Sequence, residues 1–291
     1  MRKARGHSLQ GLARALAACA ALALCALLAA CSQEGEGSLT MAGSTTVLPT
    51  AEIAAEGFEA KTGTHVLVSG LGSSAGIEAA LNGTADIASS SRQLTAEESE
   101  HELVATVIAH DGIAVIFNED NPVRGLTLDQ LRDVYAGRIT NWSQLGGPDL
   151  AIQLVNRDEA SGTRAAFRSI VMRDAPFDRS AAVLPGTGQV RDVVSRTPGA
   201  IGYISIGFVE SDHATTSVRT LAVDGVEATV ANVEDGTYPI SRDPYFFTNG
   251  DPKSAAYDYI MYVLSPDMAQ PIEDAGYIPV NFDASRGGGT R

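Results

Sequence analysis

The sequence predicts an α/β protein, because short apolar runs typical of buried strands alternate along the chain with amphipathic stretches typical of helices. Of its 291 residues, 44% are hydrophobic and 19% are charged, which is usual for a globular protein. The length exceeds what one typical domain needs, so we expect two lobes.

Residues 1–30 have the layout of a secretory signal, since a basic start precedes an uncharged run rich in Ala and Leu. That run, residues 15–30, is shorter than the roughly 18 residues of a membrane-spanning helix, which is the alternative. It ends in Leu28-Ala29-Ala30-Cys31, which resembles a bacterial lipobox, in which the cysteine is lipidated. Simple cleavage with an incidental Cys31 is the other interpretation. We expect a signal peptide over 1–30, a lipid anchor at Cys31 and a tether over 31–38.

Cysteine and charge exclude several functions. Cys19 and Cys25 would leave with the signal and Cys31 would be lipidated, so the folded body would hold no thiol. This excludes disulfides, cysteine nucleophiles and thiolate metal sites. The histidines lack metal-ligand spacing, so no metal or other cofactor is expected. The formal net charge of −14 becomes more negative without the signal, and nucleic acid is therefore excluded as a partner.

The first part of the mature chain alternates strands with helices. A strand is expected over 39–43, and then a helix with Pro49 in its first turn and Gly63 just past its end. A strand over 65–69, a helix opened by Gly72-Ser73-Ser74, a strand over 86–90 and a buried strand over 113–117 follow.

From residue 127 the alternation restarts. The expected elements are a helix over 128–135, a strand over 152–156, a helix after Ser161, a helix over about 189–195 and a strand over 201–205. Beyond residue 217 the chain is turn-rich and ends with a helix over 254–264. Strands joined through helices imply largely parallel sheets.

Three turns bearing Ser or Thr each follow an expected strand and open an expected helix. They are Gly43-Ser44-Thr45-Thr46, Gly72-Ser73-Ser74 and Ser161-Gly162-Thr163. A helix start carries unpaired N–H groups and partial positive charge, glycine admits a ligand closely, and hydroxyls add donors. Each turn alone is explained as an ordinary N-cap. Together, with Arg157 at the end of its strand, they predict an anion cradle. Glu159 is close enough in sequence to brace Arg157.

One enzyme signal competes with this interpretation. Gly72-Ser73-Ser74-Ala75-Gly76 fits G-x-S-x-G, the nucleophile elbow of α/β hydrolases, with Asp111 and His213 as formal partners of Ser74. The elbow lies only about one βα unit into the mature chain, and no HGGG-like oxyanion segment precedes it. Both features count against a serine hydrolase, which is kept as the alternative to a binding protein.

Five segments, in order, resemble the phosphate-binding lipoproteins of ABC importers. They are Ala42-Gly43-Ser44-Thr45-Thr46, Gly72-Ser73-Ser74-Ala75-Gly76, Ile139-Thr140-Asn141-Trp142, Arg157 with Ser161-Gly162-Thr163-Arg164, and Gly199-Ala200-Ile201-Gly202-Tyr203. Their order and spacing cover nearly the whole mature chain.

The resemblance implies a two-lobed Venus-flytrap fold of the type II periplasmic-binding-protein kind, with mixed sheets flanked by helices and the ligand in the interlobe cleft. It implies a monomeric, extracytoplasmic, non-catalytic protein that binds inorganic phosphate and docks on the permease subunits of an ABC transporter. Sulfate, molybdate or tungstate is the alternative ligand. The residues it places on the ligand are Ser44, Thr45, Ser73, Arg157, Ser161, Gly162 and Thr163.

The sequence departs from the family at one position. Relatives carry an aspartate after the third strand that accepts a phosphate proton, and Ser91 occupies the matching place here. Asp111, at the expected crossover into the second lobe, is the candidate substitute. We expect lobe 1 over 39–115 and 207–284, lobe 2 over 116–206 and a flexible tail over 285–291.

Overall fold

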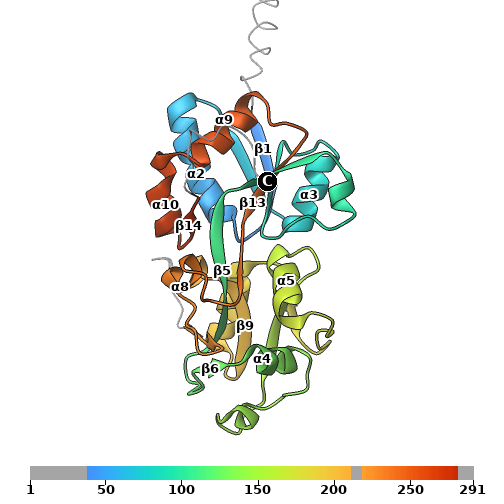
Figure 1. Cartoon of the computed structure of the whole chain (residues 1–291), viewed down its shortest axis with the longest axis vertical. Coiled ribbons are helices and arrows are strands. Elements are labelled where there is room, and N and C mark those ends of the chain that lie inside the picture. The colour runs from blue at the N-terminus through green and yellow to red at the C-terminus, as the bar shows by residue number, and fades with distance from the viewer. Residues whose placement is uncertain (1–37, 211–217, 281–291) are drawn as a thin grey trace, which may run out of the picture. The chain divides into compact units, whose positions relative to one another are not determined.

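Two mixed β-sheets, each flanked by helices, make up the part of the chain that the computed structural model describes, residues 38–210 and 218–280 (Figure 1). The expected signal, the lipid anchor at Cys31, His213 and the tail lie outside these residues. Within the described residues, no helix has the length and apolar character needed to cross a membrane.

The first sheet has the strand order β2-β1-β3-β13-β4. Its strands are β1 (Leu39–Gly43), β2 (Val66–Gly70), β3 (Ile87–Ser90), β4 (Leu103–Val107) and β13 (Tyr245–Asn249). Its helices are α2 (Leu48–Thr62), α3 (Ser73–Leu81), α9 (Ser254–Val263) and α10 (Ala269–Asp274). The strands β2, β1 and β3 run parallel, whereas β13 is antiparallel to both of its neighbours.

The second sheet has the strand order β10-β5-β9-β7-β8, and β12 and β14 also pair with β5. Its strands are β5 (Ala109–Asn118), β7 (Gln153–Arg157), β8 (Ala182–Leu184), β9 (Ala200–Ser205), β10 (Val218–Thr220), β12 (Ser241–Arg242) and β14 (Ile278–Pro279). Its helices are α4 (Leu128–Tyr135), α5 (Gly162–Phe167), α6 (Thr187–Arg196), α7 (Gly207–Glu210) and α8 (Val230–Glu234). A small separate sheet pairs β6 (Gly125–Leu126) with β11 (Ala222–Val223).

Short helical turns complete the described structure. They are the 3₁₀ turns Glu98–Glu100, Trp142–Leu145 and Pro266–Met268, and the π-helical turn Arg168–Met172, which continues α5.

Local sequence explains where the main helices begin and end. Pro49 lies in the first turn of α2, and Gly63 ends the helix in the left-handed region at φ 77°. Thr127 caps α4 through a reciprocal capping box with Gln130. Each sheet then has its own apolar core, with Phe58, Phe246 and Tyr259 in the first and Trp142 and Phe167 in the second.

The sequence-based expectation of largely parallel sheets is wrong. Strand β5 is antiparallel to β9 and β10, and β13 is antiparallel to β3 and β4. β10 and β13, like β11 and β12, lie in the stretch beyond residue 217 that the sequence presents as turn-rich. They are two to five residues long, so no helical or alternating periodicity marks them.

The chain passes between the two sheets at two neighbouring places. It leaves the first sheet at the end of β4 and enters β5 two residues later, and it returns from β12 to β13 after Asp243 and Pro244. β5 and β12 pair with each other at Gly112–Ser241 and Asp111–Arg242. The two crossing segments are thus hydrogen-bonded neighbours, and the long strand β5 runs between the two sheets in Figure 1.

Candidate functional site

Four helices begin directly after the carboxyl ends of parallel strands. α2 and α3 follow β1 and β2 of the first sheet, and α5 and α6 follow β7 and β8 of the second. Hydrogen bonds between the two groups join these helix starts at one place. The sequence analysis expected three of these helix starts at an anion site. The fourth, that of α6, opens with Gly186-Thr187 and was expected only as a helix over about 189–195.

Arg157 is the central cation where the starts of these four helices meet. It ends β7, is 1% exposed, and its Nη2 donates to Thr45 Oγ1 at 3.0 Å, while its Nη1 donates to Thr187 Oγ1 at 3.1 Å. Nε and Nη2 also donate to the carbonyls of Leu184 and Pro185. Burial lowers the pKa of Arg157 to about 10, so the guanidinium remains protonated at neutral pH.

The expected brace from Glu159 to Arg157 is wrong. Glu159 instead pairs with Arg164 of α5. Arg157 is held by backbone carbonyls and by threonine hydroxyls, which leave its charge without a carboxylate counter-ion among its recorded hydrogen bonds.

The predicted serines gather beside this arginine. Ser44 Oγ and Ser91 Oγ are 2.5 Å apart, and Ser73 Oγ accepts a hydrogen bond from the backbone N–H of Ser91 at 3.0 Å. Ser161 caps α5 by accepting from the N–H of Arg164. All four side chains are nearly fully buried. The structure thus brings together serines from four separated segments.

Gly162 allows the start of α5 to lie directly against the start of α3. A Cβ at this position would overlap Ser73 Oγ. The backbone N–H of Ser74 donates to the carbonyl of Ala160 at 3.1 Å, which links the same two turns. Any side chain at Gly162 would separate them.

Sequence reasoning missed two threonines that join the helix starts. Thr46 Oγ1 lies 3.0 Å from Thr163 Oγ1 and 3.1 Å from Thr187 Oγ1, and Thr187 Oγ1 lies 3.2 Å from Thr45 Oγ1. We define the threonine chain as these four residues: Thr45, Thr46, Thr163 and Thr187. The turn Pro185-Gly186-Thr187-Gly188 before a helix was the available signal for Thr187.

Asp111 lies in β5 and is fully buried, and it is connected to the serines and threonines of the site through Arg242. Its Oδ1 accepts from Ser205 Oγ at 2.7 Å, and its Oδ2 accepts from Nε and Nη2 of Arg242 at 3.0 and 2.9 Å. Burial raises the pKa of Asp111, and the charge of Arg242 opposes that rise. Arg242, which the sequence analysis did not single out, donates in turn to Thr163 and to the carbonyl of Ser91.

The arrangement around Ser74 differs from a nucleophile elbow. Ser74 Oγ accepts from Nη2 of Arg92 at 3.0 Å, and Arg92 forms a bidentate pair with Glu98. Asp111, the acid considered for a triad, is engaged by Arg242. None of the hydrogen bonds recorded for Ser74 in the described part of the chain involves a histidine.

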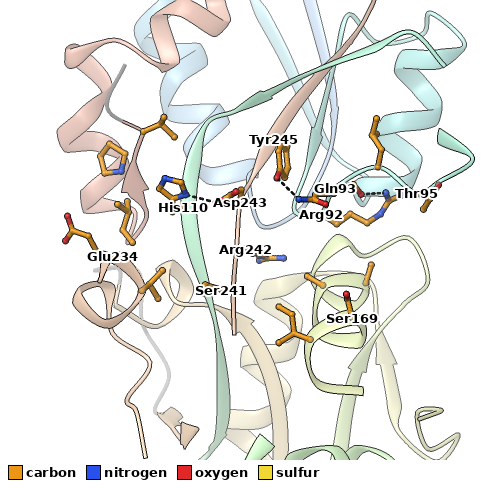
Figure 2. A pocket seen from close by; sticks show the side chains of 18 residues that line it. Arg92, Gln93, Thr95, His110, Ser169, Glu234, Ser241, Arg242, Asp243 and Tyr245 are labelled. Atoms are coloured by element: carbon orange, nitrogen blue, oxygen red, sulfur yellow. Dashed lines mark hydrogen bonds and ion pairs between the residues drawn. The ribbon is translucent and has the colours of Figure 1, made fainter. Parts of the chain in front are cut away.

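A cleft of about 1140 Å³ opens beside this cluster (Figure 2). One wall includes Arg92, Gln93 and Tyr245, and the other includes Ser169 of the π-helical turn. Arg242 is labelled between these walls in Figure 2 and therefore belongs both to the cleft and to the buried cluster. No group of three or more His, Cys, Asp or Glu suited to a metal ion occurs among the described residues.

Two mixed α/β halves with polar groups buried where they meet define a two-lobed binding protein. Residues 29–267 match a family model described as a PBP superfamily domain. The chain is 34% identical over 254 residues to the phosphate-binding protein PstS of Bacillus subtilis, covering 85% of this chain and 82% of that protein. It is 30% identical over 258 residues to PstS of Borreliella burgdorferi, covering 85% and 92%.

Solved structures agree with these relatives. A putative phosphate ABC transporter substrate-binding protein from Clostridium perfringens, with bound phosphate, is 37% identical with a TM-score of 0.79, covering 84% of this chain and 100% of that one. An ABC-type phosphate transport receptor from Vibrio cholerae is 33% identical with a TM-score of 0.70, covering 84% and 100%. The chain belongs to the PstS family of phosphate-binding proteins, and the two-lobed fold expected from the sequence is confirmed.

Proposed function

We propose that this protein is the substrate-binding component of an ABC phosphate importer and that inorganic phosphate binds where the helix starts converge. The observation that carries the proposal is Arg157, a buried guanidinium surrounded by hydroxyls and without a carboxylate among its recorded partners. Taking a cation out of water is costly, and an anionic ligand offsets that cost. The family relationship supports phosphate as that anion.

The donors near Arg157 suit a ligand that mainly accepts hydrogen bonds. A guanidinium has five N–H groups, and the recorded contacts of Arg157 use four of them, which leaves one on Nη1. Ser73 and Ser161 each accept a backbone N–H, so each hydroxyl proton can still be donated. We propose Ser44, Thr45, Ser73, Ser91, Arg157, Ser161, Gly162 and Thr163 as the ligand-binding residues. We propose Asp111 as an indirect contributor.

We propose lobe boundaries from the sheet pairing. Lobe 1 comprises residues 39–107 and 243–277, and lobe 2 comprises residues 109–242 together with β14, which pairs with β5. The return to lobe 1 lies later than residue 207 because β10 and β12 pair with β5 of the second sheet. Phosphate would lie between the lobes, near the place where both crossing segments meet.

We further propose that the protein is an extracytoplasmic, monomeric lipoprotein without catalytic activity. The lipobox-like Leu28-Ala29-Ala30-Cys31 supports a signal peptide over 1–30 and an anchor at Cys31. The engagement of Ser74 by Arg92 and of Asp111 by Arg242 weighs against hydrolysis. The ligand-bound form would dock on the permease subunits in the membrane.

A thermal-shift series tests the ligand. At a ligand concentration about a thousandfold above Kd, binding stabilises the folded state by about 4.1 kcal/mol. We expect 1 mM phosphate to raise Tm by several degrees, and sulfate, molybdate and tungstate at equal ionic strength to raise it less. A larger shift with any of the three competitors would assign the site to that oxyanion instead.

A further inference from the structure

Arg242 is a second buried arginine at the site, and the function proposed above gives it no role. Its side chain is 4% exposed, and Nε and Nη2 grip Asp111 at 3.0 and 2.9 Å. Both N–H groups converge on one carboxylate oxygen, Oδ2, so the edge of the guanidinium that carries Nε and Nη2 faces Asp111. Nη1 is thereby aimed away from Asp111.

That nitrogen connects the two lobes. Nη1 donates to the carbonyl of Ser91, which follows β3 of the first sheet, at 3.1 Å. It also donates to Thr163 Oγ1 in α5, which follows β7 of the second sheet, at 2.9 Å. Arg242 itself lies on β12, next to β5 at the place where the chain crosses between the sheets. One guanidinium therefore joins the crossing strands to both walls of the proposed site.

The threonine chain links Arg242 to Arg157. Arg242 donates to Thr163, and Arg157 donates to Thr187 and Thr45, so both arginines act on the chain as donors only. Three hydroxyl–hydroxyl contacts join the four threonines, and each contact uses one hydroxyl proton. Four hydroxyls supply four protons, so one remains for an acceptor outside the chain whichever way the bonds point.

We propose that Arg242 is a positioning residue of the anion site, clamped by Asp111, which holds Ser91 and Thr163 together across the two lobes and orients the threonine chain toward the ligand. This inference rests on the proposed function. Asp111 contributes through Arg242 rather than by touching the anion. Because Arg242 and Asp111 neutralise each other, the pair places N–H donors beside the site without leaving a lone buried charge.

Loss of Arg242 should change the rate of ligand release but not the rate of ligand capture. The contacts of Nη1 to Ser91 and Thr163 hold the lobes together, so their loss accelerates opening and release. Encounter with the open protein does not use them, and affinity differences among related complexes generally lie in the dissociation rate. A residue that only supported folding would lower the fraction of active protein and leave the release rate of that fraction unchanged.

The test measures equilibrium binding and release of radiolabelled phosphate by dialysis and rapid filtration. We expect Arg242→Gln to raise both Kd and the dissociation rate at least about tenfold, with the association rate within about twofold of wild type. Arg242→Lys, which keeps a charge opposite Asp111 but loses the fork, should raise the dissociation rate about three- to fivefold. Arg138→Gln, which removes a surface pair with Asp133, is the matched control and should change neither rate by more than about twofold.

Each outcome decides the matter. If Arg242→Gln is folded and releases phosphate within twofold of wild type, the inference is overturned. If Arg242→Gln does not fold, Arg242→Lys decides it, and a wild-type release rate in that variant overturns the inference. If wild type binds phosphate and the variants behave like it, the proposed function stands and only the role of Arg242 is lost. If wild type does not bind phosphate, the proposed function and the role of Arg242 are both contradicted.

Discussion

Replacement of Arg157 by alanine removes the guanidinium on which the proposed phosphate site depends. The side chain is 1% exposed and already lies within 3.1 Å of hydroxyls from both lobes, so its remaining N–H and its charge face a dehydrated space. A hydrogen bond to a charged group contributes about 1.5–3 kcal/mol, and the N–H left on Nη1 can make one such bond to the anion. At about 1.4 kcal/mol per decade, Arg157→Ala should weaken phosphate binding by roughly one to two orders of magnitude.

Calorimetric titration of phosphate into folded Arg157→Ala, wild type and Arg219→Ala measures this loss. Arg219 is exposed on β10 and serves as the control. Arg157→Lys should recover only part of the affinity, because the ammonium lacks the planar fork. A folded alanine variant that binds phosphate within about threefold of wild type would refute the assignment of Arg157.

The pH dependence of the same site follows from burial. Because burial lowers the pKa of Arg157 to about 10, the ligand-free folded state loses this proton before the unfolded chain does. The free energy of unfolding should therefore increase as pH rises above about 10, so this group then destabilises the folded state less. Phosphate affinity should fall over the same range, since the cation that attracts the ligand is lost. Titrations between pH 8 and 10.5 measure both trends.

Three further changes test other parts of the account. Ser74→Ala should remain folded, and neither it nor wild type should hydrolyse an ester substrate. Ester turnover by wild type that disappears in this variant would indicate a hydrolase. Cys31→Ser should release the protein from membranes in cell fractionation, whereas continued association would indicate a retained N-terminal helix. Gly76→Ala should lower the free energy of unfolding by about 1–3 kcal/mol or more, because a Cβ there would overlap the backbone of β1; an unchanged Tm would contradict that packing.

Local patterns were sufficient to predict most of the helices and strands up to β9, but they did not predict β4. β1 and α4 have the bounds expected from the sequence, because β1 is an apolar run closed by Gly43 and Thr127 precedes a strongly amphipathic stretch. The ends of β2, β3, β7 and β9 shift by only one residue at most. These elements are specified by neighbouring residues, which a single sequence displays.

The partners of the site were not predictable in the same way. The contact between Asp111 and Arg242 joins residues 131 positions apart, and Arg242 sits in a two-residue strand with no periodicity. Glu159 was expected to brace Arg157 because it is near in sequence, yet the β7–α5 turn directs it to Arg164. The hydroxyls at helix starts could be predicted, but the side chains that connect them across the two lobes required the structure.

The most direct test of the central claim is calorimetric titration of phosphate into protein from which any co-purified ligand has been removed. The account predicts one site per chain with a Kd of about 1 μM or lower, equivalent to about −8 kcal/mol. Absence of binding at millimolar phosphate, in protein shown to be folded, would contradict it.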